Sequence, residues 1–160
     1  VLRGDPHYAE KAARISALTR DLSELLPELL PALKARLGES GARQQPALVF
    51  HPPCTLQHGQ QLKGGVETQL AALGFSVRIA SSESHLCCGS AGTYSVLNPA
   101  LSYQLRDRKL GNLAPTAHEV IISANIGCIT HLQSGTSTPV RHWVEVLDAA
   151  LSATPPAFAA

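Results

Sequence analysis

Three short apolar segments, each followed by cysteine, constrain most strongly what this 160-residue chain can fold into. The segments are residues 47–50, 75–80 and 119–124, and the cysteines after them are Cys54, the adjacent Cys87 and Cys88, and Cys128. Short runs rich in Val, Ile, Leu and Phe are typical of buried strands. The chain has four cysteines in all, so each of its thiols follows a predicted strand.

Helical patterns separate these strands and predict a parallel sheet. We expect helices over residues 56–73, 99–113 and 143–151, a short helix between Asn125 and Leu132, and a fourth strand over residues 140–142. Strands that alternate with helices at spacings of about thirty residues pair in parallel through right-handed crossovers. We therefore predict an α/β fold, a Rossmann-like parallel sheet of about four strands flanked by helices.

Two of these helices carry more detailed expectations. Gly64 and Gly65 fall inside the helix over residues 56–73, where they lower helix stability, so we expect a kink or a close contact there. Asn98 is expected to cap the helix over residues 99–113. In that helix the expected inward residues are Leu101, Leu105 and Leu113, and the expected outward residues are Arg106, Asp107, Arg108 and Lys109.

A helical segment, residues 1–38, precedes the sheet and carries an amphipathic apolar stripe. Pro27 and Pro31 interrupt it, so we expect a break near Leu26 and a second helix over residues 28–37. The stripe needs a partner surface, either the following domain or a preceding one. The chain is thus divided into a helical segment (1–38), a polar linker (39–46), an α/β domain (47–151) and a disordered tail (152–160). It begins with Val1 and contains no methionine, so we expect a processed chain or a piece of a longer one.

Composition excludes several classes of function. A net charge of +1 gives no broad attraction for nucleic acid, and an aromatic content of 4% offers few surfaces on which bases could stack. No apolar run reaches the roughly eighteen residues that a membrane-spanning helix needs. Four cysteines are few for a domain of this size, which favours thiols kept for metal or redox chemistry over stabilising disulfides.

The strand positions predict that the four thiols converge. Loops that follow parallel strands lie at the same edge of the sheet, where such folds bind ligands. We therefore predict a metal or iron–sulfur site on Cys54, Cys87, Cys88 and Cys128, although their spacings match neither a zinc finger nor a ferredoxin. The alternative is that the cysteines are small buried apolar residues.

Other residues near the cysteines are candidates for a supporting shell around the site. Four histidines lie within four residues of a cysteine: His51, His58, His85 and His131. Imidazole binds metal directly or donates a hydrogen bond to a sulfur ligand. Gly89 opens the turn Gly-Ser-Ala-Gly, whose backbone N–H groups can face an anionic centre. No nucleophile with a positioned base is visible, so we predict no catalytic residue in this chain.

At these residues the sequence resembles a known family. Cys54, then Cys87-Cys88-Gly89, then Asn125-Ile126-Gly127-Cys128 resemble the cysteine-rich CCG domain of heterodisulfide reductases and of iron–sulfur subunits of flavin-linked dehydrogenases. CTLQHGQQL, SHLCCGSAGTYSVL and ANIGCITHLQSGT are similar to the C-terminal part of glycolate oxidase (glycolate dehydrogenase) iron–sulfur subunits. The likeness extends over nearly all of residues 1–151. The family pattern usually ends in Cys-x-x-Cys, and here Asn125 occupies the first of those two positions.

The resemblance implies an electron-transfer role. The four remaining cysteines would hold a [4Fe–4S] cluster or zinc, with Asn125 among the residues that shape the site. A partner subunit with FAD would oxidise glycolate to glyoxylate, and the electrons would pass to a quinone or another membrane-associated acceptor. The location implied is the cytoplasm, peripheral at the inner membrane through the complex.

Three alternatives remain open from the sequence. The first is a zinc-binding structural or docking domain without redox activity. The second is the equivalent subunit of a lactate-utilisation complex. The third is a thiol–disulfide redox domain in which Cys87 and Cys88 work with a distal partner.

Overall fold

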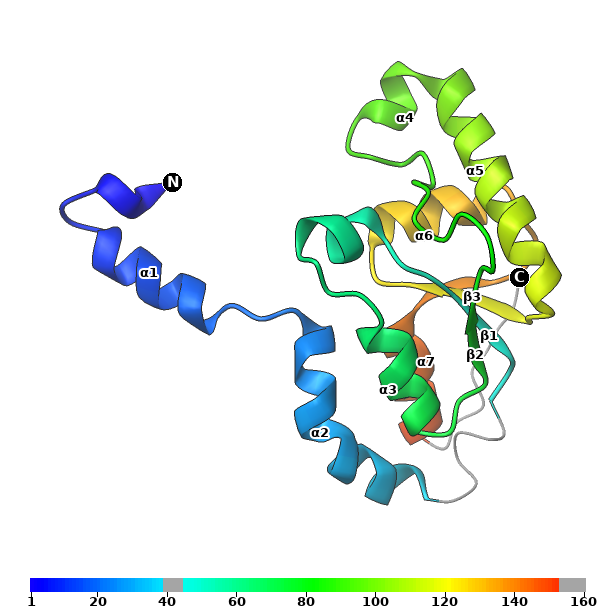
Figure 1. The fold of residues 1–160 in the computed structure, drawn as a ribbon, viewed down its shortest axis with the longest axis horizontal. Helices are drawn as coiled ribbons and strands as arrows, with labels where there is room; N and C mark the ends of the chain where they lie inside the picture. Colours follow the sequence, from blue (N-terminus) through cyan, green and yellow to red (C-terminus); the bar gives the residue numbers. More distant parts are fainter. Residues whose placement is uncertain (39–44, 153–160) are drawn as a thin grey trace.

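Four short parallel strands form the centre of the computed structural model, which describes residues 1–38 and 45–152 (Figure 1). They lie in the order β2-β1-β3-β4 and comprise β1 (Leu48–His51), β2 (Val77–Ile79), β3 (Val120–Ser123) and β4 (Val140–His142). Every strand pair is parallel, and β1 is in register with β3 from Leu48 opposite Val120 to His51 opposite Ser123. The predicted α/β fold with about four parallel strands is confirmed.

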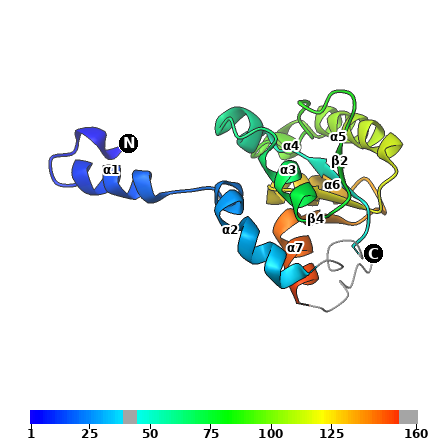
Figure 2. The same ribbon diagram turned by 60° about the horizontal axis from the view of Figure 1, so that its bottom comes forward.

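Helices cover both faces of the sheet (Figures 1 and 2). On one face, α3 (Gly65–Ala72) and α7 (Trp143–Leu151) pack on the strands, and α2 (Leu22–Leu37) packs on these two helices. On the other face lie α5 (Pro99–Leu113) and α6 (Ile126–Gln133). Side chains alternate along a strand, so Leu48 and Phe50 join the first core and Val49, between them, joins the second.

The N-terminal helices differ from the prediction. The break lies before Leu22 rather than near Leu26, because Asp21 and Glu24 form a capping box that begins α2. Pro27 and Pro31 then lie within α2, one turn apart and exposed. A proline has no N–H, so α2 continues past each of them with one backbone hydrogen bond fewer.

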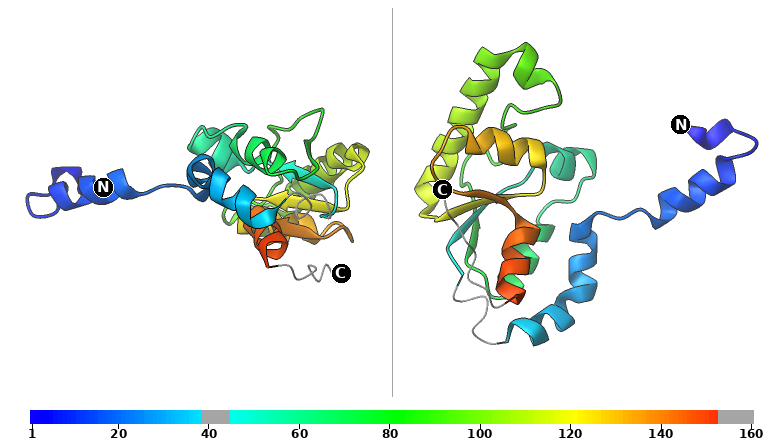
Figure 3. Two further views of the ribbon diagram at one scale, coloured as in Figure 1. Left: turned by 90° about the horizontal axis from the view of Figure 1, so that it is seen from below. Right: turned by 180° about the vertical axis from the view of Figure 1, so that it is seen from behind.

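The apolar stripe of α1 (Ala9–Leu18) is not buried against the α/β body in the described part of the chain, and its contacts there are with the preceding turn. None of its residues is buried, and Ile15 is 66% exposed. The helix and the short 3-10 turn η1 (Leu2–Gly4) extend away from the α/β body (Figure 3). The part of the stripe in α2 does pack on the following domain, where Leu26 and Leu37 are buried in the first core.

The predicted helix over residues 56–73 is split in two. A π-helical turn, η2 (Thr55–Gly59), follows β1, and α3 begins only after Gly64, whose φ of +77° suits glycine. The glycine pair thus separates two helices rather than bending one.

The helix α5 has the predicted bounds, but two of its residues face the opposite way from the prediction. Leu101 is 50% exposed, and Lys109, expected outside, is 1% exposed. The side chain of Asn98 makes no capping hydrogen bond. The helices α6 and α7 lie close to their predicted bounds, and two short helices, α4 (Tyr94–Leu97) and η3 (Ala114–Thr116), complete the elements of the described chain.

The predicted tail falls outside the described residues apart from residue 152, as does the predicted linker apart from residues 45–46. Among the helices of the described ranges, none is both long and apolar enough to cross a membrane.

Candidate metal centre

The strand order brings the three cysteine-bearing loops to one edge of the sheet. Cys54 follows β1, Cys128 lies in the first turn of α6 after β3, and these two strands are neighbours. The chain leaves β1 toward β2 on one side and later returns to β3 on the other, which makes the β1–β3 boundary the topological switch point where ligands bind in such sheets. Cys87 and Cys88 reach the same place from the loop after β2.

The four sulfurs form two pairs. Cys88 and Cys128, both buried, share a hydrogen bond, and the hydroxyl of Ser90 lies 3.2 Å from the sulfur of Cys88 and 3.8 Å from that of Cys128. Cys54 and Cys87, both half-buried, share a second one. All four thiols are free. The buried pair, Cys88 and Cys128, forms the inner half of the site, and the half-buried pair, Cys54 and Cys87, forms the outer half.

The inner pair divides its charge unequally. The hydrogen bond from Cys128, helped by His51 and Ser90, lowers the pKa of Cys88 to about 3 against its burial. The same bond raises the pKa of Cys128, which keeps its proton. In the outer pair, burial and the charges of neighbouring thiolates raise the pKa of Cys54 to about 11. The metal-free site therefore holds a ready thiolate at its centre.

A buried cation, which the sequence analysis placed at the surface, lies beside the thiols. The ammonium of Lys109 donates hydrogen bonds to the carbonyl oxygens of Glu83 (2.7 Å) and Ser84 (3.2 Å), which precede the cysteine pair. Burial lowers the pKa of Lys109, and the thiolates of Cys88 and Cys54 oppose that shift. The sequence predicted an exposed Lys109 because the residues before it in the helix are charged. Nothing near Lys109 in the sequence indicates that it binds the carbonyl oxygens of Glu83 and Ser84.

The turn after the cysteine pair requires glycine. Gly89 has φ of +92°, and a β-carbon there would collide with the carbonyl oxygen of Ser102 on α5. The Gly89 N–H donates to the sulfur of Cys87 over 3.3 Å, in line with the expectation that this turn offers N–H groups to the site. The hydroxyl of Ser102 donates to the carbonyl of Gly89 over 2.8 Å, which fixes the turn against α5.

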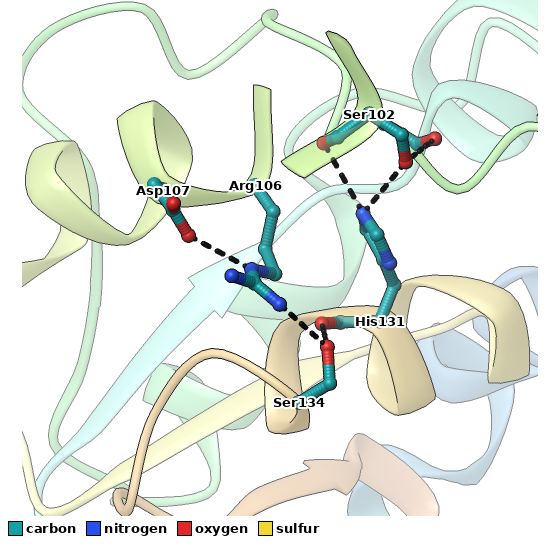
Figure 4. Close-up of polar contacts among 6 residues, drawn as sticks. Ser102, Arg106, Asp107, His131 and Ser134 are labelled. Carbon is teal, nitrogen blue, oxygen red and sulfur yellow. Dashed lines mark hydrogen bonds and ion pairs between the residues drawn. The ribbon is translucent and has the colours of Figure 1, made fainter. Parts of the chain in front are cut away.

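His131 supports the site from behind. Its Nε2 lies 3.0 Å from the hydroxyl of Ser102 (Figure 4), and its ring stacks on Tyr103. Arg106 donates to Ser134, and Ser134 in turn donates to the carbonyl of His131 (Figure 4). These contacts join α5 to α6, and they place His131 beside the serine that holds the turn.

The remaining supporting candidates lie in different places. His58 and His85 are exposed on neighbouring loops, with Nε2 of His58 3.4 Å from the His85 carbonyl oxygen. Asn125 caps α6: its side-chain oxygen accepts from the N–H groups of Gly127 (2.9 Å) and Cys128 (3.3 Å). The structure thus shows Asn125 as the cap of α6.

The fourth histidine, His51, lies closest to the inner pair. Its ligand atoms and those of Cys88 and Cys128 all lie within 4.8 Å of one another, and all three residues are buried. Both ring nitrogens of His51 are buried without a hydrogen-bonding partner among the described residues. Strand alternation from Val49 to His51 was the signal that could have placed His51 on the cysteine side of the sheet.

The donor set fits a thiophilic metal or an iron–sulfur cluster. Four sulfurs and one imidazole converge, and thiolates with imidazole are the ligands that zinc and iron–sulfur clusters take. The orphaned nitrogens of His51 and the Gly89 N–H aimed at Cys87 are features that a bound metal centre would use.

Comparison with known proteins gives a consistent result. Residues 48–133, more than half of the chain, match the cysteine-rich domain family designated CCG. The chain is 48% identical over 151 residues to the glycolate oxidase iron-sulfur subunit of Escherichia coli (strain K12), an alignment that spans 94% of this chain and 35% of the relative. It is 29% and 28% identical to lactate utilization protein A of Geobacillus thermodenitrificans and Geobacillus kaustophilus, over 92% and 93% of this chain and 62% of each relative. The chain thus spans about a third of the first relative and three fifths of the other two, and it belongs to the cysteine-rich CCG domain family.

Proposed function

We propose that this chain is an electron-transfer domain that holds an iron–sulfur centre on Cys54, Cys87, Cys88 and Cys128. The observation that carries the proposal is the arrival of four thiols from three loops at one sheet edge. A cluster bound there would supply a one-electron redox centre. Zinc bound to the same donors would supply only a structural link, which is the competing function.

The residues around the thiols suit a buried redox site. The inner pair is shielded from water, which strengthens the electrostatic influence of nearby charges. The ammonium of Lys109 offsets part of the negative charge of the thiolates, and the Gly89 N–H donates to Cys87. The half-buried outer pair leaves one side of the site open for electron exchange or metal loading.

Within a complex, we propose that a flavin-containing partner subunit oxidises glycolate to glyoxylate and passes electrons through this centre to a quinone or another membrane-associated acceptor. The complex would lie in the cytoplasm, peripheral at the inner membrane. The identity of 48% to a subunit named for glycolate oxidase, against 29% to a protein named for lactate utilization, favours glycolate over lactate as the substrate.

Metal analysis of the anaerobically purified chain tests the centre. Iron and sulfide in stoichiometric amounts, with broad visible absorption that bleaches on reduction, would support the proposal. A colourless protein with one zinc would refute it in favour of the docking function. Cys88→Ser should lose the metal, whereas Ala91→Ser, an exposed position in the same turn, should keep it.

The substrate is tested on the complex purified with its partner subunits. Acceptor reduction should be faster with glycolate than with lactate, and the Cys88→Ser complex should lose it while its flavin is still reduced by glycolate. A preference for lactate would contradict the proposed substrate and leave the proposed centre intact.

A further inference from the structure

His51 is a buried histidine whose ring lies beside the inner thiols. It is the last residue of β1 and is 1% exposed. Its backbone is well held, because its carbonyl accepts a hydrogen bond from the hydroxyl of Ser123 over 2.9 Å. Its two ring nitrogens are buried without a hydrogen-bonding partner among the described residues. Buried polar groups without partners are costly and rare in native proteins, so an orphaned imidazole indicates a ligand.

The strand aims this imidazole at the inner thiols. Val49 packs in the core that contains Cys88 and Cys128, and His51, two residues later, faces the same side of the sheet. The ligand atoms of the three residues lie within 4.8 Å of one another, and ligands around one tetrahedral metal are separated by about 3.5–3.8 Å. The three side chains are therefore close enough to bind the same metal centre after small movements.

The other histidines near the cysteines are differently engaged. Nε2 of His131 faces the hydroxyl and the carbonyl oxygen of Ser102, at 3.0 and 3.3 Å, which fixes that ring away from the thiols. His58 and His85 are exposed. His51 therefore differs from the other three in being both buried at the thiols and unpartnered in the described structure.

We propose that His51 is a direct nitrogen ligand of the metal centre, bound beside Cys88 and Cys128. The inference rests on the proposed function, because it assumes that the cysteines hold a metal. It assigns the inner half of the site two sulfurs and one nitrogen, and the outer half the sulfurs of Cys54 and Cys87. A neutral imidazole adds no negative charge, so the centre should be easier to reduce than one with a thiolate in its place.

The test uses the iron-loaded chain grown with ¹⁵N-histidine and pulsed electron paramagnetic resonance of its reduced centre. We expect a strong ¹⁵N coupling from a bound imidazole in the unsubstituted chain. In His51→Cys, which retains a metal-binding side chain, that coupling should vanish while iron remains, and the reduction potential should fall. The control is His58→Gln at an exposed site, which should leave both the coupling and the potential unchanged. If the chain holds zinc, the same measurement is made after replacement by Co²⁺.

The outcomes separate this inference from the proposed function. Iron present without histidine ¹⁵N coupling in the unsubstituted chain would refute ligation by His51 and leave the centre on the cysteines standing. A coupling that persists in His51→Cys would assign the nitrogen to another histidine and would also overturn the inference. A chain that takes up no metal would refute the proposed function, and the inference with it.

Discussion

Replacing Lys109 with methionine tests whether a buried ammonium holds the cysteine loop. Methionine preserves most of the volume and the apolar stem of lysine, so the packing of α5 changes little. The substitution removes two hydrogen bonds, to the carbonyl oxygens of Glu83 (2.7 Å) and Ser84 (3.2 Å), and one positive charge that faces the thiolates. The perturbation is therefore confined to the loop before Cys87.

The expected loss of stability follows from these contacts. A hydrogen bond from a charged donor contributes about 1.5–3 kcal/mol, and two are lost. Two effects offset this loss: the half-buried carbonyls regain water, and the cost of burying an ammonium disappears. We expect a net destabilisation of about 2–3 kcal/mol in the metal-free chain. The loss should be larger in the metal-loaded chain, where the ammonium also offsets thiolate charge.

Urea unfolding of the metal-free and metal-loaded chains, with metal affinity measured alongside, checks both parts of the expectation. Lys63→Met removes an exposed lysine and is the matched control, expected to change stability by less than about 0.5 kcal/mol. The reasoning is refuted if Lys109→Met is as stable as the control, or if it is destabilised equally with and without metal.

Three further predictions concern the turn, the cap and the thiols. Gly89→Ala should destabilise the chain by about 3 kcal/mol or more in thermal unfolding, because its φ of +92° and its contact with α5 exclude a β-carbon, whereas Gly111→Ala, in open space on α5, should be neutral or stabilising. Asn125→Ala should cost about 1 kcal/mol in urea unfolding through loss of the α6 cap, and Asn125→Asp should restore most of it. Metal affinity should rise with pH up to about pH 11, because Cys54, with a pKa raised to about 11, must release its proton, while Cys88, with a pKa of about 3, binds as a thiolate. Calorimetry in two buffers should count fewer protons released for Cys54→Ser, and an affinity that falls with pH would contradict this assignment.

The sequence predicted the sheet and the meeting of the cysteines because both depend on local patterns. Short apolar runs mark strands, and parallel pairing places the loops after the strands at one edge of the sheet. The bounds of α5 and α7 were also predicted correctly, since Pro99 and the end of β4 mark them in the sequence. The patterns could not supply the strand order, which decides that Cys54 and Cys128 come from neighbouring strands.

The errors have two causes, a long-range contact in the case of Lys109 and an earlier helix start in the case of α2. Lys109 lies among charged residues on α5, yet the loop carbonyls and the thiolates make its burial favourable. Pro27 was expected to break a helix, but the capping box at Asp21 begins α2 earlier and the helix continues past the proline. The position of His51 beside Cys88 and Cys128 could not be predicted, because its distance from them along the sequence conceals that all three share one face of the sheet.

An asparagine rather than a cysteine at position 125 is consistent with the charge balance of this site. The side chain of Asn125 satisfies two N–H groups at the start of α6, a task that a thiol performs poorly. A fifth thiolate at this position would add negative charge to a buried region where Lys109 supplies the opposing positive charge. With His51 as a neutral ligand beside the four cysteines, the site would have five ligands. It would carry one negative charge fewer than a site with five thiolates. Asn125→Cys, which creates a Cys-x-x-Cys pattern with Cys128, should therefore lower the reduction potential of the centre and destabilise α6. A raised reduction potential would show that charge does not decide which ligand is favoured at this position.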